Sequence, residues 1–179
     1  MRLFTAVDVP DPLRETLSAF QDEGDLDVRW TSPEQFHVTL RFIGDVDEER
    51  ARQYEAVLSG VEVPPAQCIP YGLDVLPSRR SPRVLMLGLE RTDSMMALYR
   101  AVSDVLESEG LEPEGRTYRP HVTIARLDDA RRESVHAFLQ AHEERSYDPF
   151  EADQFILYGS TLTPEGALHE PVAAYELAL

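Results

Sequence analysis

The spacing of apolar and polar residues predicts strands and helices in turn along the chain. Residues 2–9 alternate as in a strand, and Leu13, Leu17 and Phe20 then recur at helical spacing. The same two periods predict the rest of the chain. Further strands are expected at 28–30, 36–43, 73–77, 84–90, 121–127, 155–160 and near 172–178, with 61–70 as a connecting segment. Further helices are expected from Asp45 or Asp47 to Gly60, from Thr92 or Asp93 to Gly110, and over about 130–143.

The predicted elements repeat, because each half of the chain reads strand, helix, strand, helix, strand. The middle strand of each half contains His-Val-Thr and an aliphatic residue, first at His37 and again at His121. LDVLPS at 73–78 and FILYGS at 155–160 correspond at nearly the same offset. The repeat predicts an internally duplicated α+β fold in which two similar lobes face each other across a cleft. We expect one bilobal domain with approximate repeats at 1–80 and 81–179.

Each His-Val-Thr motif places an imidazole and a hydroxyl on the same side of a strand, because alternate residues of a strand face opposite ways. His37 and Thr39 share one face of their strand, and His121 and Thr123 share one face of theirs. The aliphatic residues of the motifs face the core instead. If an approximate twofold axis relates the lobes, all four polar side chains converge on one place.

Two imidazoles and two hydroxyls suit the hydrolysis of a phosphodiester without metal. One neutral His takes a proton from the attacking water, one protonated His gives a proton to the leaving oxygen, and each transfer contributes about 10²–10⁴-fold. The Thr hydroxyls stabilise charge on the phosphoryl oxygens. A single copy of the motif is better interpreted as a core histidine, whereas two matched copies favour a site. Metal binding by the pair is a weaker hypothesis, since no third ligand stands at a sensible spacing.

The composition is strongly acidic and contains no lysine. The 33 Asp and Glu residues compare with 17 basic residues, all Arg, and the net charge is −16. Such a surface suits concentrated salt, where charge repulsion is screened, so we expect a halophilic, cytoplasmic protein. A mesophile with a high-GC genome is the alternative. The single cysteine, Cys68, excludes an internal disulfide and a cysteine zinc cluster. Neither a signal peptide nor a membrane helix is expected.

The motifs and the blocks around them resemble one family almost from end to end. The chain is similar to the two-histidine phosphoesterases and, more narrowly, to the prokaryotic RNA 2′,3′-cyclic phosphodiesterases, also called 2′-5′ RNA ligases. The resemblance lies in LFTAVDVP, VRWTSPEQFHVTLRFIGDV, PRVLMLG, RPHVTIAR and FILYGSTLTPEGALHE. It implies two antiparallel sheets lining a central cleft with helices outside, no cofactor, and hydrolysis of RNA 2′,3′-cyclic phosphate ends to 2′-phosphomonoesters. Reversible 2′-5′ ligation stays open.

The resemblance also implies roles for individual residues. It makes His37 the proton donor and His121 the proton acceptor, with Arg126 near the phosphate. Arg41 follows the first motif, where the family often has Lys, and His169 stands where an aromatic residue, often Tyr, is usual. The further substrate contacts that we expect are Thr39, Thr123 and Arg41.

Other residues leave two interpretations open. Phe42 and Tyr118 are either stacking surfaces for a base or core residues. One turn between strands carries either a cationic lip for RNA phosphates or an ordinary solvated surface, at Arg79, Arg80 and Arg83.

Three functional hypotheses follow. The first is a monomer that acts, without metal, cofactor or membrane, on RNA ends bearing 2′,3′-cyclic phosphate, tRNA-derived ends among them. The second keeps the chemistry but changes the substrate to a small cyclic phosphate of the ADP-ribose type or a 2′-5′-linked oligonucleotide. The third is an RNA-binding module with little turnover, which the intact histidines and threonines disfavour. Turnover of a nucleoside 2′,3′-cyclic phosphate in EDTA separates the three.

Overall fold

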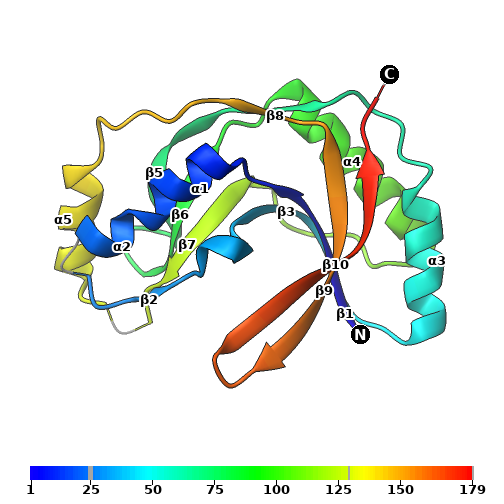
Figure 1. Ribbon diagram of the computed structural model, residues 1–179, viewed down its shortest axis with the longest axis horizontal. Coiled ribbons are helices and arrows are strands. Elements are labelled where there is room, and N and C mark those ends of the chain that lie inside the picture. The colour runs from blue at the N-terminus through cyan, green and yellow to red at the C-terminus, as the bar shows by residue number, and fades with distance from the viewer. Residues whose placement is uncertain (24–25, 129, 179) are drawn as a thin grey trace.

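The computed structural model describes residues 1–23, 26–128 and 130–178, which form a large antiparallel sheet with helices packed around it (Figure 1). In these residues the helices are α1 (Asp11–Ser18), α2 (Phe20–Glu23), the 3-10 helix η1 (Pro33–Gln35), α3 (Glu48–Leu58), α4 (Asp93–Ser108) and α5 (Arg132–Ala141). The strands are β1 (Arg2–Asp8), β2 (Arg29–Trp30), β3 (His37–Asp45), β4 (Ala66–Cys68), β5 (Pro70–Pro77), β6 (Pro82–Leu89), β7 (His121–Arg126), β8 (Phe150–Ala152), β9 (Gln154–Thr163) and β10 (Gly166–Glu176).

Side-chain caps fix where two of the helices begin. The Asp47 carboxylate accepts a hydrogen bond from the Arg50 N–H at 2.8 Å ahead of α3. The Thr92 hydroxyl accepts one from the Met95 N–H at 3.2 Å ahead of α4. Each cap satisfies a backbone donor that the first turn of a helix leaves open. Of the two caps predicted for each helix, the structure therefore selects Asp47 and Thr92.

The two strands that carry the His-Val-Thr motifs, β3 and β7, are neighbours in the middle of the sheet. The strand order is β10-β9-β1-β3-β7-β6-β5, and β2 pairs with β7. A single residue pair, Val38 with Val122, joins β3 to β7. On either side of this pair lie two antiparallel sheet halves, and Figure 1 shows α3 and α4 beside one half and α1, α2 and α5 beside the other. The predicted α+β fold is confirmed, with its two sheets continuous through that pair.

The sheet halves exchange strands between the two halves of the sequence. β3 pairs with β1 as β7 pairs with β6, and β9 adds to β1 as β5 adds to β6. Each sheet half therefore takes two strands from the other half of the chain: β9 and β10 join β1 and β3, and β2 and β5 join β6 and β7. The short β4 and β8, which precede β5 and β9, pair with each other. These pairings interchange under an approximate twofold, while the boundaries 1–80 and 81–179 stay a prediction.

Several element boundaries differ from those expected. The proline-containing connection at 61–70 includes β4, because Ala66 and Cys68 are buried and pair with β8. The last helix, α5, is shorter than the predicted 130–143. The final strand begins at Gly166, earlier than expected, because β10 pairs with β9 along a hairpin that projects from the sheet in Figure 1. None of the helices in the described ranges is long and apolar enough to cross a membrane.

Candidate active site

The four polar side chains of the two motifs lie on the same face of the sheet. The aliphatic residues Val38, Leu40, Val122 and Ile124 are at most 1% exposed, which assigns them to the core face. His37, Thr39, His121 and Thr123, which alternate with them, lie on the opposite, partly exposed face. One residue beyond the Val38–Val122 pair in either direction, the antiparallel register sets His37 opposite Thr123 and Thr39 opposite His121. The structure thus brings together the four motif residues predicted from the sequence.

Hydrogen bonds fix the tautomer of His37. Its Nδ1 lies 2.7 Å from the Gln35 carbonyl oxygen, which can only accept, so Nδ1 carries the proton. Its Nε2 lies 3.1 Å from the Thr39 hydroxyl. In the neutral ring Nε2 accepts from that hydroxyl, and in the protonated ring it becomes a donor on the open face of the sheet. His37 is therefore oriented to deliver a proton there.

His121 is held in the same way. Its Nδ1 donates to the Arg119 carbonyl oxygen at 2.6 Å, which leaves the lone pair of the neutral Nε2 as a proton acceptor. In both motifs the carbonyl belongs to the residue two positions before the histidine. The repeat therefore extends to the backbone contact that orients each ring.

The surroundings of His37 are largely aromatic. The ring centroid lies 5.0 Å from that of Phe4, 5.5 Å from that of His169 and 6.3 Å from that of Tyr158. Burial lowers the pKa of His37 to about 4, although the Gln35 carbonyl opposes this shift. The charges of His169 and His121 lower this pKa further, and the Asp8 carboxylate raises it. At neutral pH and without a bound anion, the imidazole of His37 is therefore in its neutral form.

The surroundings of His121 are cationic. Burial is the largest cause that lowers its pKa, the Arg119 carbonyl opposes the shift, and the charges of Arg119 and Arg126 add to the lowering. Gly88 is the cross-strand partner of His121, and the Tyr71 ring occupies the space that a side chain at Gly88 would take. A half-exposed tyrosine therefore lies beside the second histidine.

A bulge in each motif strand changes which residue faces the site. Leu40 of β3 has no partner on β1, because the neighbouring β1 residues Ala6 and Thr5 pair with the residues on either side of it. Ile124 of β7 likewise has no partner on β6. Each bulge adds one residue and reverses the alternation beyond it. Phe42 and Arg126 consequently return to the face of the histidines, and both are exposed.

Arg41 does not lie where the sequence placed it. Its side chain is 3% exposed, with the guanidinium 2.7 Å from a Glu107 oxygen and 3.3 Å from a Glu114 oxygen. It also donates to the Glu112 carbonyl. The bulge at Leu40 turns Arg41 toward the interior, where its guanidinium forms ion pairs with two carboxylates. We therefore withdraw the prediction that Arg41 contacts the phosphate.

Tyr118 and Phe42, each predicted either to stack on a base or to pack in the core, have different surroundings. The Tyr118 hydroxyl donates to the Thr39 carbonyl at 2.7 Å, and its ring stacks on Tyr99 with centroids 4.1 Å apart. Burial is the main cause that raises the pKa of Tyr118. Phe42, in contrast, is 62% exposed and lies 6.0 Å from Phe4 between ring centroids. Tyr118 supports the first motif strand, whereas Phe42 is available to a ligand.

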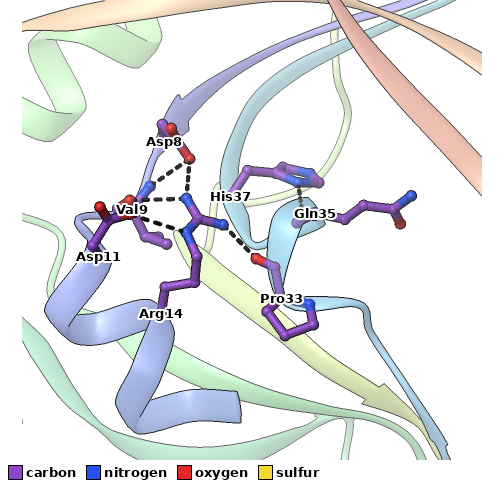
Figure 2. A network of polar contacts seen from close by, with 7 residues as sticks. All are labelled: Asp8, Val9, Asp11, Arg14, Pro33, Gln35 and His37. Carbon is purple, nitrogen blue, oxygen red and sulfur yellow. Dashed lines mark hydrogen bonds and ion pairs between the residues drawn. The ribbon is translucent and has the colours of Figure 1, made fainter.

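A polar network around Arg14 supports the loop that holds His37 (Figure 2). Arg14 donates to the Asp8 carboxylate at 2.7 Å, to the Val9 carbonyl at 3.0 Å and to the Pro33 carbonyl. It thereby ties the end of β1 and the start of α1 to η1, whose last residue, Gln35, accepts from His37. The Gln35 side chain also donates to the Ala167 carbonyl of β10. Most of these contacts are made to backbone carbonyls on elements that are distant in sequence. No sequence motif could therefore predict them.

Among the described residues, no group of three or more His, Cys, Asp and Glu side chains is arranged to hold a metal ion. The groups at the junction of β3 and β7 are instead those of general acid–base chemistry on an anionic centre.

Comparisons with known proteins agree with this geometry. The profile of the family described as LigT like Phosphoesterase matches residues 7–86 and 88–169. An RNA 2′,3′-cyclic phosphodiesterase of Archaeoglobus fulgidus is 31% identical over 98% of this chain and 100% of that protein. One of Thermotoga maritima is 30% identical over 95% of this chain and 92% of that protein.

A solved structure supports the fold. That of E. coli LigT complexed with 3′-AMP superimposes with a TM-score of 0.79 at 21% identity, over 99% of this chain and 98% of that one. The two family matches together span most of the chain and include both motif strands. The chain therefore belongs to the LigT-like phosphoesterase family.

Proposed function

We propose that the chain is an RNA 2′,3′-cyclic phosphodiesterase, which hydrolyses a cyclic phosphate end to the 2′-phosphomonoester. The observation that carries the proposal is the junction of β3 and β7, where two His-x-Thr pairs share one face of the sheet. The relatives that bear this name support it over nearly the whole chain.

The reaction uses one histidine for each proton. Water attacks the phosphorus while the neutral Nε2 of His121 takes its proton, and a new P–O bond forms. The bond from phosphorus to the ribose 3′ oxygen breaks, and the protonated Nε2 of His37 gives its proton to that oxygen. The products are a 2′-phosphate and a 3′-hydroxyl. Each proton transfer contributes about 10²–10⁴-fold.

The neighbours of the histidines stabilise the phosphoryl group. Thr39 and Thr123 offer hydroxyl donors to its oxygens, and Arg126 offers a charge on the same face. These groups act most strongly where negative charge grows in the transition state.

Substrate charge resolves the protonation of His37. With the site empty, the pKa of about 4 keeps the ring neutral at physiological pH. A phosphodiester anion at the junction raises the pKa of both histidines, because an adjacent negative charge favours the imidazolium. His37 then has the proton that a general acid needs, and Asp8 acts in the same direction.

A turnover assay tests the proposal. The protein is incubated with a nucleoside 2′,3′-cyclic phosphate in EDTA, and the product is identified by phosphorus NMR. We expect the 2′-phosphomonoester. A 3′-phosphomonoester contradicts the assigned leaving oxygen, and hydrolysis confined to a cyclic phosphate of the ADP-ribose type contradicts the RNA assignment.

The finer aspects of the proposal rest on composition and resemblance. We propose a monomer that works in a salty cytoplasm in RNA processing, with tRNA-derived ends among its substrates. The acidic, lysine-free composition supports the halophilic assignment. Gel filtration and activity across a salt series test the oligomeric state and the halophilic assignment.

A further inference from the structure

Seven of the chain's 17 basic residues gather at one end of the sheet half formed by β2, β7, β6 and β5. They come from the paired ends of β2 and β7, from the turn between β5 and β6 and the beginning of β6, and from the N-cap and first residue of α5. In Figure 1, β2, the end of β7 and the start of α5 lie together at the lower left. All seven are exposed. This arginine surface consists of Arg29, Arg79, Arg80, Arg83, Arg126, Arg131 and Arg132.

Contacts between the segments hold these exposed arginines near one another. Arg29 is the cross-strand partner of Arg126. The Leu127 N–H donates to the Arg83 carbonyl at 2.9 Å, which joins the end of β7 to the beginning of β6, just after the turn. The Arg132 guanidinium donates to the Arg80 carbonyl at 3.1 Å, which joins the turn to α5. Three segments distant in sequence are therefore fixed side by side.

The arginine surface stands out against the charge of the whole chain, −16. Among the described residues, the carboxylates within ion-pair distance of it are Asp74, 3.4 Å from Arg79, and Asp128, 2.9 Å from Arg29. The exposed Glu133 follows the surface along α5. Arg14 and Arg41, by comparison, are partly or wholly buried and bind carboxylates. Mutually repelling cations in a strongly acidic protein suit a polyanion as partner.

The arginine surface begins at the site itself. Arg126 lies on the face of His121, and its charge lowers the pKa of that histidine. Val84 of β6 is the cross-strand partner of Arg126, and the turn with Arg79 and Arg80 comes just before this end of β6, away from the junction of β3 and β7. A chain of phosphates that ends at the histidines can follow this course.

We propose that the arginine surface binds the backbone phosphates of the RNA strand whose 2′,3′-cyclic end occupies the site. The proposal rests on the proposed function and adds to it a substrate class: oligonucleotide ends are preferred to mononucleoside cyclic phosphates. Arginine suits this role because its planar guanidinium bonds phosphate oxygens in pairs. Recognition is by charge, so base sequence matters little.

Two triple variants test the proposal. Arg79, Arg80 and Arg83 are replaced by Gln in the first, which leaves the groups assigned to catalysis intact. Arg52, Arg91 and Arg100, exposed residues on or near α3 and α4, are replaced by Gln in the control. Both variants lose three positive charges, so a difference between them reports the location of the charge rather than its total. Thermal unfolding checks that both fold.

The kinetic readout compares two substrates across a salt series. With an RNA oligonucleotide bearing the cyclic end, kcat/KM of the first variant should fall by about tenfold and its log–log salt dependence should flatten by about 2, since each single-strand phosphate contact contributes about 0.7. With a mononucleoside cyclic phosphate, its kcat/KM should stay within about twofold of the parent, because that substrate does not reach the turn. The control should match the parent on both substrates.

A binding measurement keeps this test separate from the proposed function. Fluorescence anisotropy with an RNA that ends in a 2′-phosphate reports affinity without turnover. Weaker binding by the first variant alone supports the arginine surface even if the parent hydrolyses neither substrate, which would count against the proposed function only. Equal affinities in all three proteins, equal losses in both variants, or no binding by the parent overturn the inference.

Discussion

The two motif strands share a backbone arrangement and differ in what surrounds it. In each, the histidine Nδ1 donates to the carbonyl two residues earlier, and a bulge follows the threonine. Around His37 lie aromatic rings and the carboxylate of Asp8, whereas around His121 lie the charges of Arg119 and Arg126.

This difference in surroundings explains how two copies of the same motif can supply a proton donor and a proton acceptor. The arginine charges favour the neutral form of His121, which a proton acceptor requires. Asp8 favours the protonated form of His37, which a proton donor requires, and burial opposes it until an anion arrives. The motif sets the position of each ring, and the neighbours set its proton affinity.

The largest expected effect comes from removing either histidine. His37→Ala and His121→Ala should each lower kcat on a 2′,3′-cyclic phosphate by about 10²-fold or more. With a p-nitrophenolate leaving group, which needs no proton, His37→Ala should lose much less while His121→Ala should lose as much as before. Equal losses on both substrates contradict the assignment of donor and acceptor.

The next largest effect should be on stability in acid, where the low pKa of His37 acts. The pKa of His37 is about 4 in the folded protein and about 6.5 in the unfolded chain, so between these values the unfolded chain binds the extra proton. Folding stability due to this group is therefore lost as pH falls, by about 2 kcal/mol at pH 5. His37→Gln should remove this loss and flatten the pH dependence of urea unfolding between pH 7 and 5. An unaltered pH dependence contradicts the low pKa.

Arg126 and Phe42 occupy matching places after the two bulges and should differ in kinetic effect. Arg126→Ala should lower kcat by about tenfold, because its charge acts on the transition state. Phe42→Ala should raise KM for a nucleotide and leave kcat nearly unchanged, because an exposed ring contributes binding by stacking. Michaelis kinetics of the two variants measure this contrast. A normal kcat in Arg126→Ala reduces that residue to positioning.

The smallest effect should come from Asp8. Asp8→Asn removes the charge that raises the pKa of His37, at nearly constant volume. The limb of the kcat/KM pH profile that reports His37 should move to lower pH, and activity at neutral pH should fall by less than about tenfold. Asp11→Asn is the matched control, since Asp11 also contacts Arg14, at 3.7 Å, but has no named effect on His37. Equal shifts in both variants point to Arg14 instead.

Period-two alternation was sufficient to predict the site face of both motif strands up to the threonines. It fails beyond them because each bulge reverses the alternation, and bulges depend on the pairing strand rather than on the residues that form them. The prediction that Arg41 contacts the phosphate is wrong, because the bulge turns its side chain inward, whereas Phe42, for which both stacking and core packing are open, is exposed.

The support of the histidines was less accessible to prediction. Asp8 and Tyr158 reach His37 from β1 and β9, and a single sequence does not state which strands pair. The hydrogen bonds to Gln35 and Arg119 use backbone carbonyls, so the identity of these residues does not predict the contacts. The fold class followed from the order of elements, but the exchange of strands between the halves did not.

That exchange also bears on synthesis at the ribosome. β1 (Arg2–Asp8) lies between β3 and β9 in the sheet, yet β9 begins only at Gln154, far later in the chain. The sheet half that contains β1 and β3 stays incomplete, with the long edge of β1 uncovered, until β9 has been translated. A nascent chain of this topology must remain unaggregated over the long interval between β1 and β9, and the repulsion between its many carboxylates serves that purpose before any fold exists.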